Sequence, residues 1–386
     1  MIVGLLSDCI HTKTPEGKIA TENHIYIRQM QALSKHFEKM VICCPFVAFD
    51  ASKVVSVYDS PSISFMPLPN VGGNSIKEKF QLLKAIPIWL KSFKQLNKQV
   101  DIVYQRFPNN LNIPGFFFFY IIRKKVFATY TGTWQTEANQ PLSYRFQKWL
   151  LKKFFRGPVW VYSNEKILQK NLIAGFSPSY TLMEWNEEIE NVQHRIKKLK
   201  HQKLQAIKMI SVGTLNANKN QLYLLQTCLL LRDAHIPFHL TLVGEGSLKQ
   251  VYQQFVQEHH LQSSVSLTGG LNYQSLRALY RQNDFVVQAA ISEGFGKVPI
   301  EGFFHGLVPI LNQSGVAPYI TDNGKRGFLF NAVQPESLFN VLQQVYSTLP
   351  AQLLADFVAR GRIFAQTQTL ENWADGYHKK IVAYFG

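Results

Sequence analysis

Short apolar segments alternate with amphipathic helical patterns along the first half of the chain. The apolar segments have the length of β-strands and lie at residues 2–6, 40–44, 63–66, 102–105, 126–130 and 159–162. Between them apolar residues recur at three- and four-residue intervals, as in residues 24–37, which is typical of helices packed on a sheet. This alternation predicts a parallel sheet covered by helices on both faces.

Residues 183–205 interrupt the alternation with a polar run and a basic stretch at 194–203. We expect a linker there, followed by a solvated helix. The alternation then resumes, with strands at 207–212, 238–243, 265–267, 284–288 and 308–311 and helices at 221–231, 248–258, 274–282, 299–304 and 335–348. We therefore predict an α/β protein of two Rossmann-like domains, residues 1–183 and 184–368, whose ligands bind at the carboxyl ends of the strands.

The composition narrows the class of protein. The 386 residues are 46% hydrophobic and 17% charged, which excludes a disordered chain. The four cysteines form no C-x-x-C pair, and we expect them to be reduced thiols of a cytoplasmic protein. The start of the chain lacks the pattern of a secretory leader. The most apolar run, residues 113–122, is too short to span a bilayer, which takes about twenty residues.

The formal net charge of +16 is concentrated in the first half, where residues 60–160 carry 15 basic and 3 acidic residues. Two predicted helices, 76–99 and 144–156, hold most of this excess. Pro87 is expected to kink or divide the first helix. The basic stripe of this helix is formed by Lys77, Lys84, Lys91 and Lys98. Its apolar face is formed by Phe80, Leu83, Leu90 and Phe93. In the second helix the basic face is formed by Arg145, Lys148, Lys152 and Arg156. The apolar face is formed by Phe146, Trp149, Leu150 and Phe154.

Two interpretations of this charge stay open. The helices are either ordinary amphipathic helices with solvated lysines, or an interfacial surface that binds an anionic membrane. Nucleic acid is disfavoured because no nucleic-acid-binding motif accompanies the charge.

The segment Ser292-Glu293-Gly294-Phe295-Gly296-Lys297-Val298-Pro299-Ile300-Glu301-Gly302 carries the clearest candidate chemistry. It follows an apolar strand and opens a helix, and Pro299 fits the first turn of that helix. The two glycines allow a ligand to approach the backbone, while the helix N-terminus favours phosphate. Carboxylates here suit a ligand rich in hydroxyl groups. Taken alone, the segment fits equally well a tight glycine turn with a capping Glu293 and an exposed Glu301.

Other predicted strands also end in glycine-containing turns. These are Gly213-Thr214-Leu215-Asn216-Ala217-Asn218-Lys219, Gly244-Glu245-Gly246 and Thr268-Gly269-Gly270. The turn at Gly244 lacks the third glycine of the dinucleotide fingerprint and its downstream acid, which disfavours NAD.

In this order the motifs resemble the retaining glycosyltransferases of family 4, in the glycosyl transferases group 1 superfamily with the GT-B fold. That family carries an E-x7-E element, matched by Glu293 and Glu301, and a Gly-x-Leu…Lys element, matched from Gly213 to Lys219. The Gly244 turn and the run from Ser314 to Gly327 match in the same order. The resemblance is looser in the first domain.

The resemblance implies a role for each matching position. Glu301 would hold the donor ribose, and Glu293 the transferred sugar, nearest the reacting centre. Lys219 would bind the diphosphate, and the backbone of Gly296, Lys297 and Val298 the sugar and diphosphate. The remaining donor-side candidates are Gly213, Thr214, Gly244, Gly294 and Phe295. The first-domain cleft candidates are Gly17, Lys18, Glu22, His24, Thr131 and Gly132.

Two positions depart from the family pattern, since Thr214 and Thr131 stand where the family usually carries Arg and His. No D-x-D motif occurs, so we expect a metal-independent reaction without a cofactor, using a UDP- or GDP-sugar donor. By resemblance, the acceptor is a glycan or lipid-linked, as in cell-surface polysaccharide or glycolipid synthesis, and a last helix near 369–386 returns to the first domain.

The expected location is the cytoplasm, either free or bound peripherally at the inner face of the membrane. Two alternatives stay open. They are a degenerate GT-B scaffold that binds nucleotide or nothing, and a sugar-nucleotide epimerase on the same fold. The presence of Glu293, Glu301 and Lys219 favours an active transferase.

Overall fold

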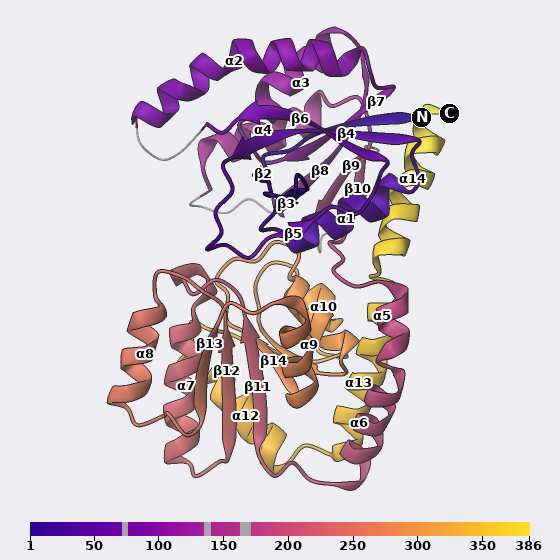
Figure 1. Cartoon of the computed structure of the whole chain (residues 1–386). Helices are drawn as coiled ribbons and strands as arrows, with labels where there is room; N and C mark the ends of the chain where they lie inside the picture. The colour runs from indigo at the N-terminus through magenta and orange to yellow at the C-terminus, as the bar shows by residue number, and fades with distance from the viewer. Residues whose placement is uncertain (72–75, 135–139, 163–170) are drawn as a thin grey trace. The chain divides into compact units, whose positions relative to one another are not determined.

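The structure is a computed structural model and describes residues 1–71, 76–134, 140–162 and 171–386 (Figure 1). It forms two compact units. Unit 1 comprises Met1–Ser179 and Leu370–Gly386, and unit 2 comprises Tyr180–Thr369. The division therefore lies at 179 instead of the predicted 183, because the segment that follows already packs as helices of unit 2. The helix expected near 369–386 is α14 (Leu370–Phe385), which packs against α1 (His24–Ser34) in unit 1.

The described strands of unit 1 form one sheet in the order β10-β9-β8-β7-β1-β4-β2-β3-β5, with β6 also paired to β4. All pairs are parallel except those of β3 with β2 and β5. The strands are β1 (Ile2–Leu6), β2 (His11–Lys13), β3 (Ile19–Thr21), β4 (Lys39–Val47), β5 (Ser56–Val57), β6 (Ile63–Pro69), β7 (Ile102–Phe107), β8 (Lys125–Thr133), β9 (Val159–Tyr162) and β10 (Leu172–Ala174).

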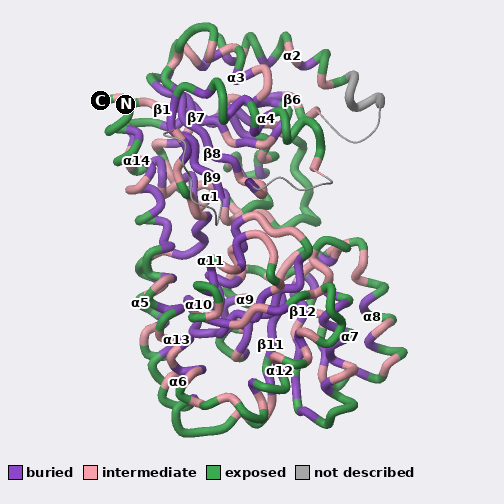
Figure 2. Tube along the Cα trace, turned by 180° about the vertical axis from the view of Figure 1, so that it is seen from behind, coloured by how far each residue is buried: buried purple, intermediate pink, exposed green. Residues whose placement is uncertain are grey.

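Helices cover both faces of this sheet, as the alternation predicts. Successive strand residues point to opposite faces, so Leu6 packs with α2 (Ile76–Asn97), α3 (Asn112–Ile121) and α4 (Leu142–Lys153). Leu5 packs on the other side with α1 and α14. The central strands are buried (Figure 2).

Unit 2 has a fully parallel sheet in the order β13-β12-β11-β14-β15-β16. Its strands are β11 (Ile207–Val212), β12 (Phe238–Val243), β13 (Val265–Gly269), β14 (Phe285–Gln288), β15 (Val308–Asn312) and β16 (Phe328–Phe330). The helices are α5 (Leu182–Glu187), α6 (Ile189–His201), α7 (Gln221–Asp233), α8 (Lys249–Glu258), α9 (Tyr273–Gln282), α10 (Lys297–Phe304), α11 (Ala317–Thr321), α12 (Ser337–Ser347) and α13 (Ala351–Gln366), with a short 3-10 helix at Ala217–Lys219.

The predicted linker near 183 is wrong in part. Thr181 caps α5 through a capping box with Glu184, and α6 follows directly and packs against α13. The polar run is therefore structured, because its carboxylates cap a helix and pair with arginines.

The predicted faces of α2 are also partly wrong. The helix runs unbroken through Pro87, and its buried residues are Ala85, Trp89, Phe93 and Leu96, while Leu83 and Leu90 are exposed. The side chains of Lys77 and Phe80 lie outside the described part of the chain. No described helix is both long enough and apolar enough to cross a membrane.

The orientation of α4 differs most from the prediction. Leu150 is buried, but Phe146, Trp149 and Phe154 are exposed, and Lys148 is buried. The reason is that Leu150 and its neighbour Leu151 pack into the core, which turns the aromatic residues outward. The buried ammonium of Lys148 donates to Gln140 Oε1 at 2.8 Å and lies 5.4 Å from the centre of the Tyr130 ring.

Candidate functional site

The loop between β14 and α10 has the shape that its glycines predict. Gly296 has a φ of 72° and precedes the first residue of α10. Across the loop, a Cβ on Gly315 would lie 2.4 Å from the carbonyl oxygen of Glu293. The chain after β15 therefore passes directly against the backbone of Glu293, and only glycine fits there.

Lys219 and Glu293 meet at the carboxyl edge of the sheet. Lys219 follows β11 and Glu293 follows β14, which are paired strands. Their side chains form an ion pair and remain 22% and 29% exposed, respectively. The two donor-side residues predicted to share a site, 74 positions apart, are thus brought together.

Asn218, which the sequence did not single out, ties the same two loops together. Its side-chain Nδ2 donates to the backbone carbonyl of Ser292 at 2.9 Å, and its backbone carbonyl accepts from the N–H of Ile291 at 2.8 Å. This clamp fixes the position of Lys219 relative to Glu293.

Glu301 lies in a different environment from Glu293. It is buried within α10, and one carboxylate oxygen accepts a hydrogen bond from Tyr280 Oη at 2.8 Å. Burial, and to a smaller extent the Glu301 carboxylate, raises the pKa of Tyr280 well above its usual value. The phenol therefore stays protonated and donates its hydrogen bond to Glu301. Glu293 is thus open to a ligand, whereas Glu301 is held from beneath by α9.

The other donor-side candidates surround this pair. Gly213 and Gly244 end β11 and β12, and a Cβ on Gly244 would lie 2.1 Å from the Gly213 carbonyl oxygen. Thr214 is exposed, Phe295 is buried, and Gly294 lies between Glu293 and Phe295 in the loop before α10. Lys297 and Val298 form the first turn of α10, at the positive end of the helix dipole. This helix end and Lys219 offer positive charge to an anion.

The six first-domain candidates are not brought together. Gly17 and Lys18 lie exposed at the turn between β2 and β3, and Glu22 forms an ion pair with Lys53 at 2.6 Å. His24 begins α1, with its Nδ1 3.0 Å from Ser56 Oγ.

Thr131 alone among the six lines a crevice in unit 1, and its hydroxyl donates to the carbonyl of Phe107 at 3.0 Å. Gly132 follows it in β8, beside the ring of Tyr130. The crevice also contains Asp8, Tyr26 and Arg106, which sequence reasoning missed. Their positions just after or at the end of strands were the available signal for Asp8 and Arg106.

No group of residues able to hold a metal ion occurs in the described ranges.

The fold defines a class of protein, the GT-B architecture found in solved glycosyltransferases. The chain superposes over 99% of its length on the Anabaena Alr3699/HepE structure, determined with UDP and glucose, with a TM-score of 0.69 and 13% identity over 99% of that chain. Sucrose-phosphate synthase from Thermosynechococcus elongatus gives a TM-score of 0.71 at 16% identity, covering 100% of this chain and 99% of that one.

The sequence comparisons concern mainly the second unit. Residues 192–362, which lie in unit 2, match the model of the family Glycosyl transferases group 1. The phosphatidylinositol N-acetylglucosaminyltransferase GPI3 subunit of Saccharomyces cerevisiae is 26% identical over 30% of this chain and 26% of that protein. The Bacillus subtilis protein EpsD is 25% identical over 44% of this chain and 44% of that protein. The chain thus spans less than half the length of these relatives.

Proposed function

We propose that this chain transfers a sugar from a nucleoside diphosphate sugar to a glycan or lipid-linked acceptor, retaining the anomeric configuration and using no metal ion. The observation that carries the proposal is the Lys219–Glu293 pair at the carboxyl edge of unit 2, beside the start of α10. A UDP donor is supported by the HepE structures with UDP and UDP-glucose. A lipid-linked acceptor is supported by the name of the yeast relative.

In this mechanism Lys219 leaves Glu293 for the diphosphate when the donor binds. Its ammonium, with the N–H groups of Lys297 and Val298, stabilises the negative charge that develops on the leaving diphosphate. Glu293 is then able to accept hydrogen bonds from the sugar hydroxyls. The acceptor oxygen bonds to the anomeric carbon on the face from which the diphosphate leaves, and the acceptor proton passes to a leaving phosphate oxygen. Lys219 and the helix end thus supply the charge that a divalent ion would otherwise supply.

The test is turnover of a panel of UDP- and GDP-sugars in the presence of EDTA, with release of the nucleoside diphosphate as the readout. Release that depends on an added acceptor supports a transferase. Consumption of the donor sugar by isomerisation without acceptor indicates an epimerase, and a thermal shift with UDP or GDP but no turnover indicates a scaffold.

We also propose that unit 1 binds peripherally to the cytoplasmic face of an anionic membrane. The support is the exposed face of α4, where the ring of Trp149 lies 5.8 Å from that of Phe146 and 4.9 Å from that of Phe154. Arginine and lysine residues of α4 flank these rings, a pattern typical of interfacial helices.

Flotation with vesicles containing phosphatidylglycerol at low salt tests this membrane proposal. Trp149→Ser is expected to reduce binding, while Val333→Ser, at an 88%-exposed site of unit 2, is the matched control. Absence of binding by the wild type contradicts the proposal.

A further inference from the structure

A polar crevice of about 310 Å³ opens in unit 1 at the carboxyl ends of β1, β7 and β8. Its lining includes Ser7, Asp8, Asn23, Tyr26, Arg106 and Thr131. These residues come from distant parts of the chain, and the parallel pairing of β1 with β7 and of β7 with β8 brings them to one edge. Ligands bind at such an edge in open α/β sheets.

Arg106 is the cation of this crevice. It is half-buried near the end of β7, and its guanidinium lies 5.1 Å from the centre of the Tyr26 ring. Within the described ranges Arg106 forms no ion pair. A guanidinium enclosed in this way is stabilised most by a bidentate anion.

Asp8 is the acid of the same crevice, and its bonds are directed elsewhere. Its carboxyl is hydrogen-bonded by Asn109 and by its own backbone N–H, and burial raises its pKa above the usual value. Asp8 therefore compensates the charge of Arg106 only in part.

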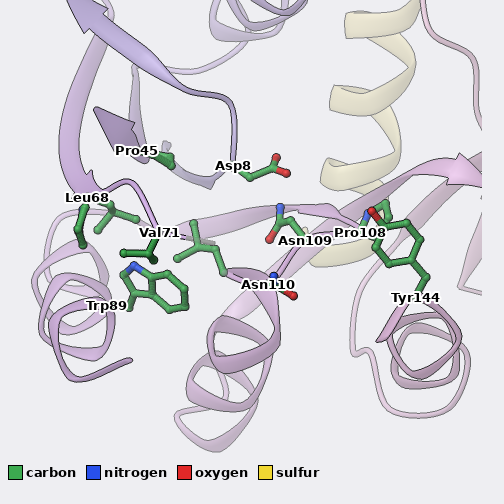
Figure 3. Close-up of a pocket in the computed structure, with 11 residues that line it drawn as sticks. Asp8, Pro45, Leu68, Val71, Trp89, Pro108, Asn109, Asn110 and Tyr144 are labelled. Carbon is green, nitrogen blue, oxygen red and sulfur yellow. The ribbon is translucent and has the colours of Figure 1, made fainter. Parts of the chain in front are cut away.

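An apolar pocket of about 200 Å³ adjoins the crevice and shares Asp8 and Pro108 with it. Figure 3 shows Leu68, Val71 and Trp89 gathered on one side of Asp8 and Asn109. A single molecule lying past Asp8 would therefore contact a cation at one end and an apolar surface at the other.

We infer that the acceptor site of unit 1 recognises an amphiphile that bears a phosphate group, with the phosphate on Arg106 and the apolar part against Trp89, Leu68 and Val71. This inference rests on the proposed function and narrows its acceptor. A neutral glycan would leave the charge of Arg106 compensated only in part by Asp8, and a free phosphate would leave the apolar pocket unfilled.

The experiment is calorimetric titration of the full chain with three probes, each below its micelle concentration. Octyl phosphate carries both features, octyl glucoside only the chain, and inorganic phosphate only the anion. Octyl phosphate is expected to bind at least about tenfold (about 1.4 kcal/mol) more tightly than either of the others. Arg106→Gln should remove most of that advantage and leave octyl glucoside unchanged, whereas Arg123→Gln, a cation outside the crevice, should change nothing. Val71→Ser should weaken octyl phosphate and leave inorganic phosphate unchanged.

Equal affinity for octyl phosphate and octyl glucoside overturns the inference, as does unchanged octyl phosphate binding by Arg106→Gln. If Arg106→Gln does not fold, Asp8→Asn provides the second test, because loss of the like charge should strengthen octyl phosphate binding. Weaker or equal binding by Asp8→Asn then overturns the inference. Acceptor-dependent release of nucleoside diphosphate tests the proposed function separately, so intact release beside a failed titration leaves the proposed function standing.

Discussion

The two units use the same kind of sheet but impose different demands on the sequence. In unit 2 the loops at the strand ends pass so close to one another that a Cβ on Gly244 or Gly315 would meet backbone atoms. The site of unit 1 is instead built from ordinary side chains such as Asp8 and Arg106. Backbone constraints restrict residues to glycine and leave a motif, while side chains on a sheet edge leave none. This explains in physical terms why the site of unit 2 is recognisable from sequence and the crevice of unit 1 is not.

The largest expected effect concerns the Lys219–Glu293 pair of unit 2. Lys219→Met should reduce sugar transfer by about 100- to 1,000-fold, the effect of removing one preorganised charge-stabilising group. The assay is acceptor-dependent release of nucleoside diphosphate. Lys249→Met is the matched control, because Lys249 also forms an ion pair with a glutamate of unit 2. Its Nζ lies 2.8 Å from Glu245 Oε1. Similar losses in both variants would contradict a specific role for Lys219.

The backbone constraint itself is tested by Gly244→Ala. The added Cβ would lie 2.1 Å from the Gly213 carbonyl oxygen, at a φ of +143°. We expect a loss of more than about 3 kcal/mol in the free energy of unfolding, measured with urea. Gly376→Ala is the control, since nothing lies within 4 Å of its Cβ position. It should be neutral or slightly stabilising because it lies in a helix, and a similar loss in both variants contradicts the packing argument.

In unit 1 the corresponding vulnerability is a side chain, His11. Its buried ring contacts Tyr58 and Phe46, and burial lowers its pKa to about 4 from the usual 6.5. The unfolded chain therefore binds a proton that the folded chain does not, and stability falls as the pH drops from 6.5 towards 4. The loss amounts to at most about 3 kcal/mol.

Urea unfolding at pH 7 and pH 4 measures this effect. His11→Phe removes the titrating group, so this variant should lose less stability between the two pH values than the wild type. Equal losses would show that His11 is not the titrating group.

The smallest expected effect concerns Glu301, the buried glutamate of the E-x7-E element in unit 2. Tyr280→Phe removes the donor to buried Glu301 and should cost about 1–2 kcal/mol of unfolding free energy. Tyr346→Phe, in α12 of unit 2, is the control, because Tyr346 is half-buried and its hydroxyl forms no hydrogen bond within the described ranges. If Tyr280→Phe costs no more than the control, the bond to Glu301 does not stabilise the fold.

Much of the fold was predictable because strands and helices leave periodic patterns. The predicted strands of both sheets lie close to the observed ranges, whereas the short strands β2, β3, β5, β10 and β16 were not predicted. Lys219 and Glu293 meet because adjacent parallel strands end at one edge. The orientation of α4 was not predictable, since apolar residues occupy both of its faces and only the sheet beneath selects Leu150 and Leu151.

The partner of Glu301 could not be predicted either. Tyr280 lies on another helix, and no local pattern links the two residues. Arg106 lies near the end of an apolar strand like many other residues, and its place in a crevice depends on the register of β1, β7 and β8.

Hydrogen exchange of the full chain with and without a UDP- or GDP-sugar tests the central claim most directly. The account predicts that the donor slows exchange of amides in 214–219 and 292–298. It predicts no change around the cavity of about 480 Å³ near the amino ends of β11 and β14, lined by Arg195, Lys208 and Arg281. Protection around that cavity, with none at Lys219 or the start of α10, would contradict the account.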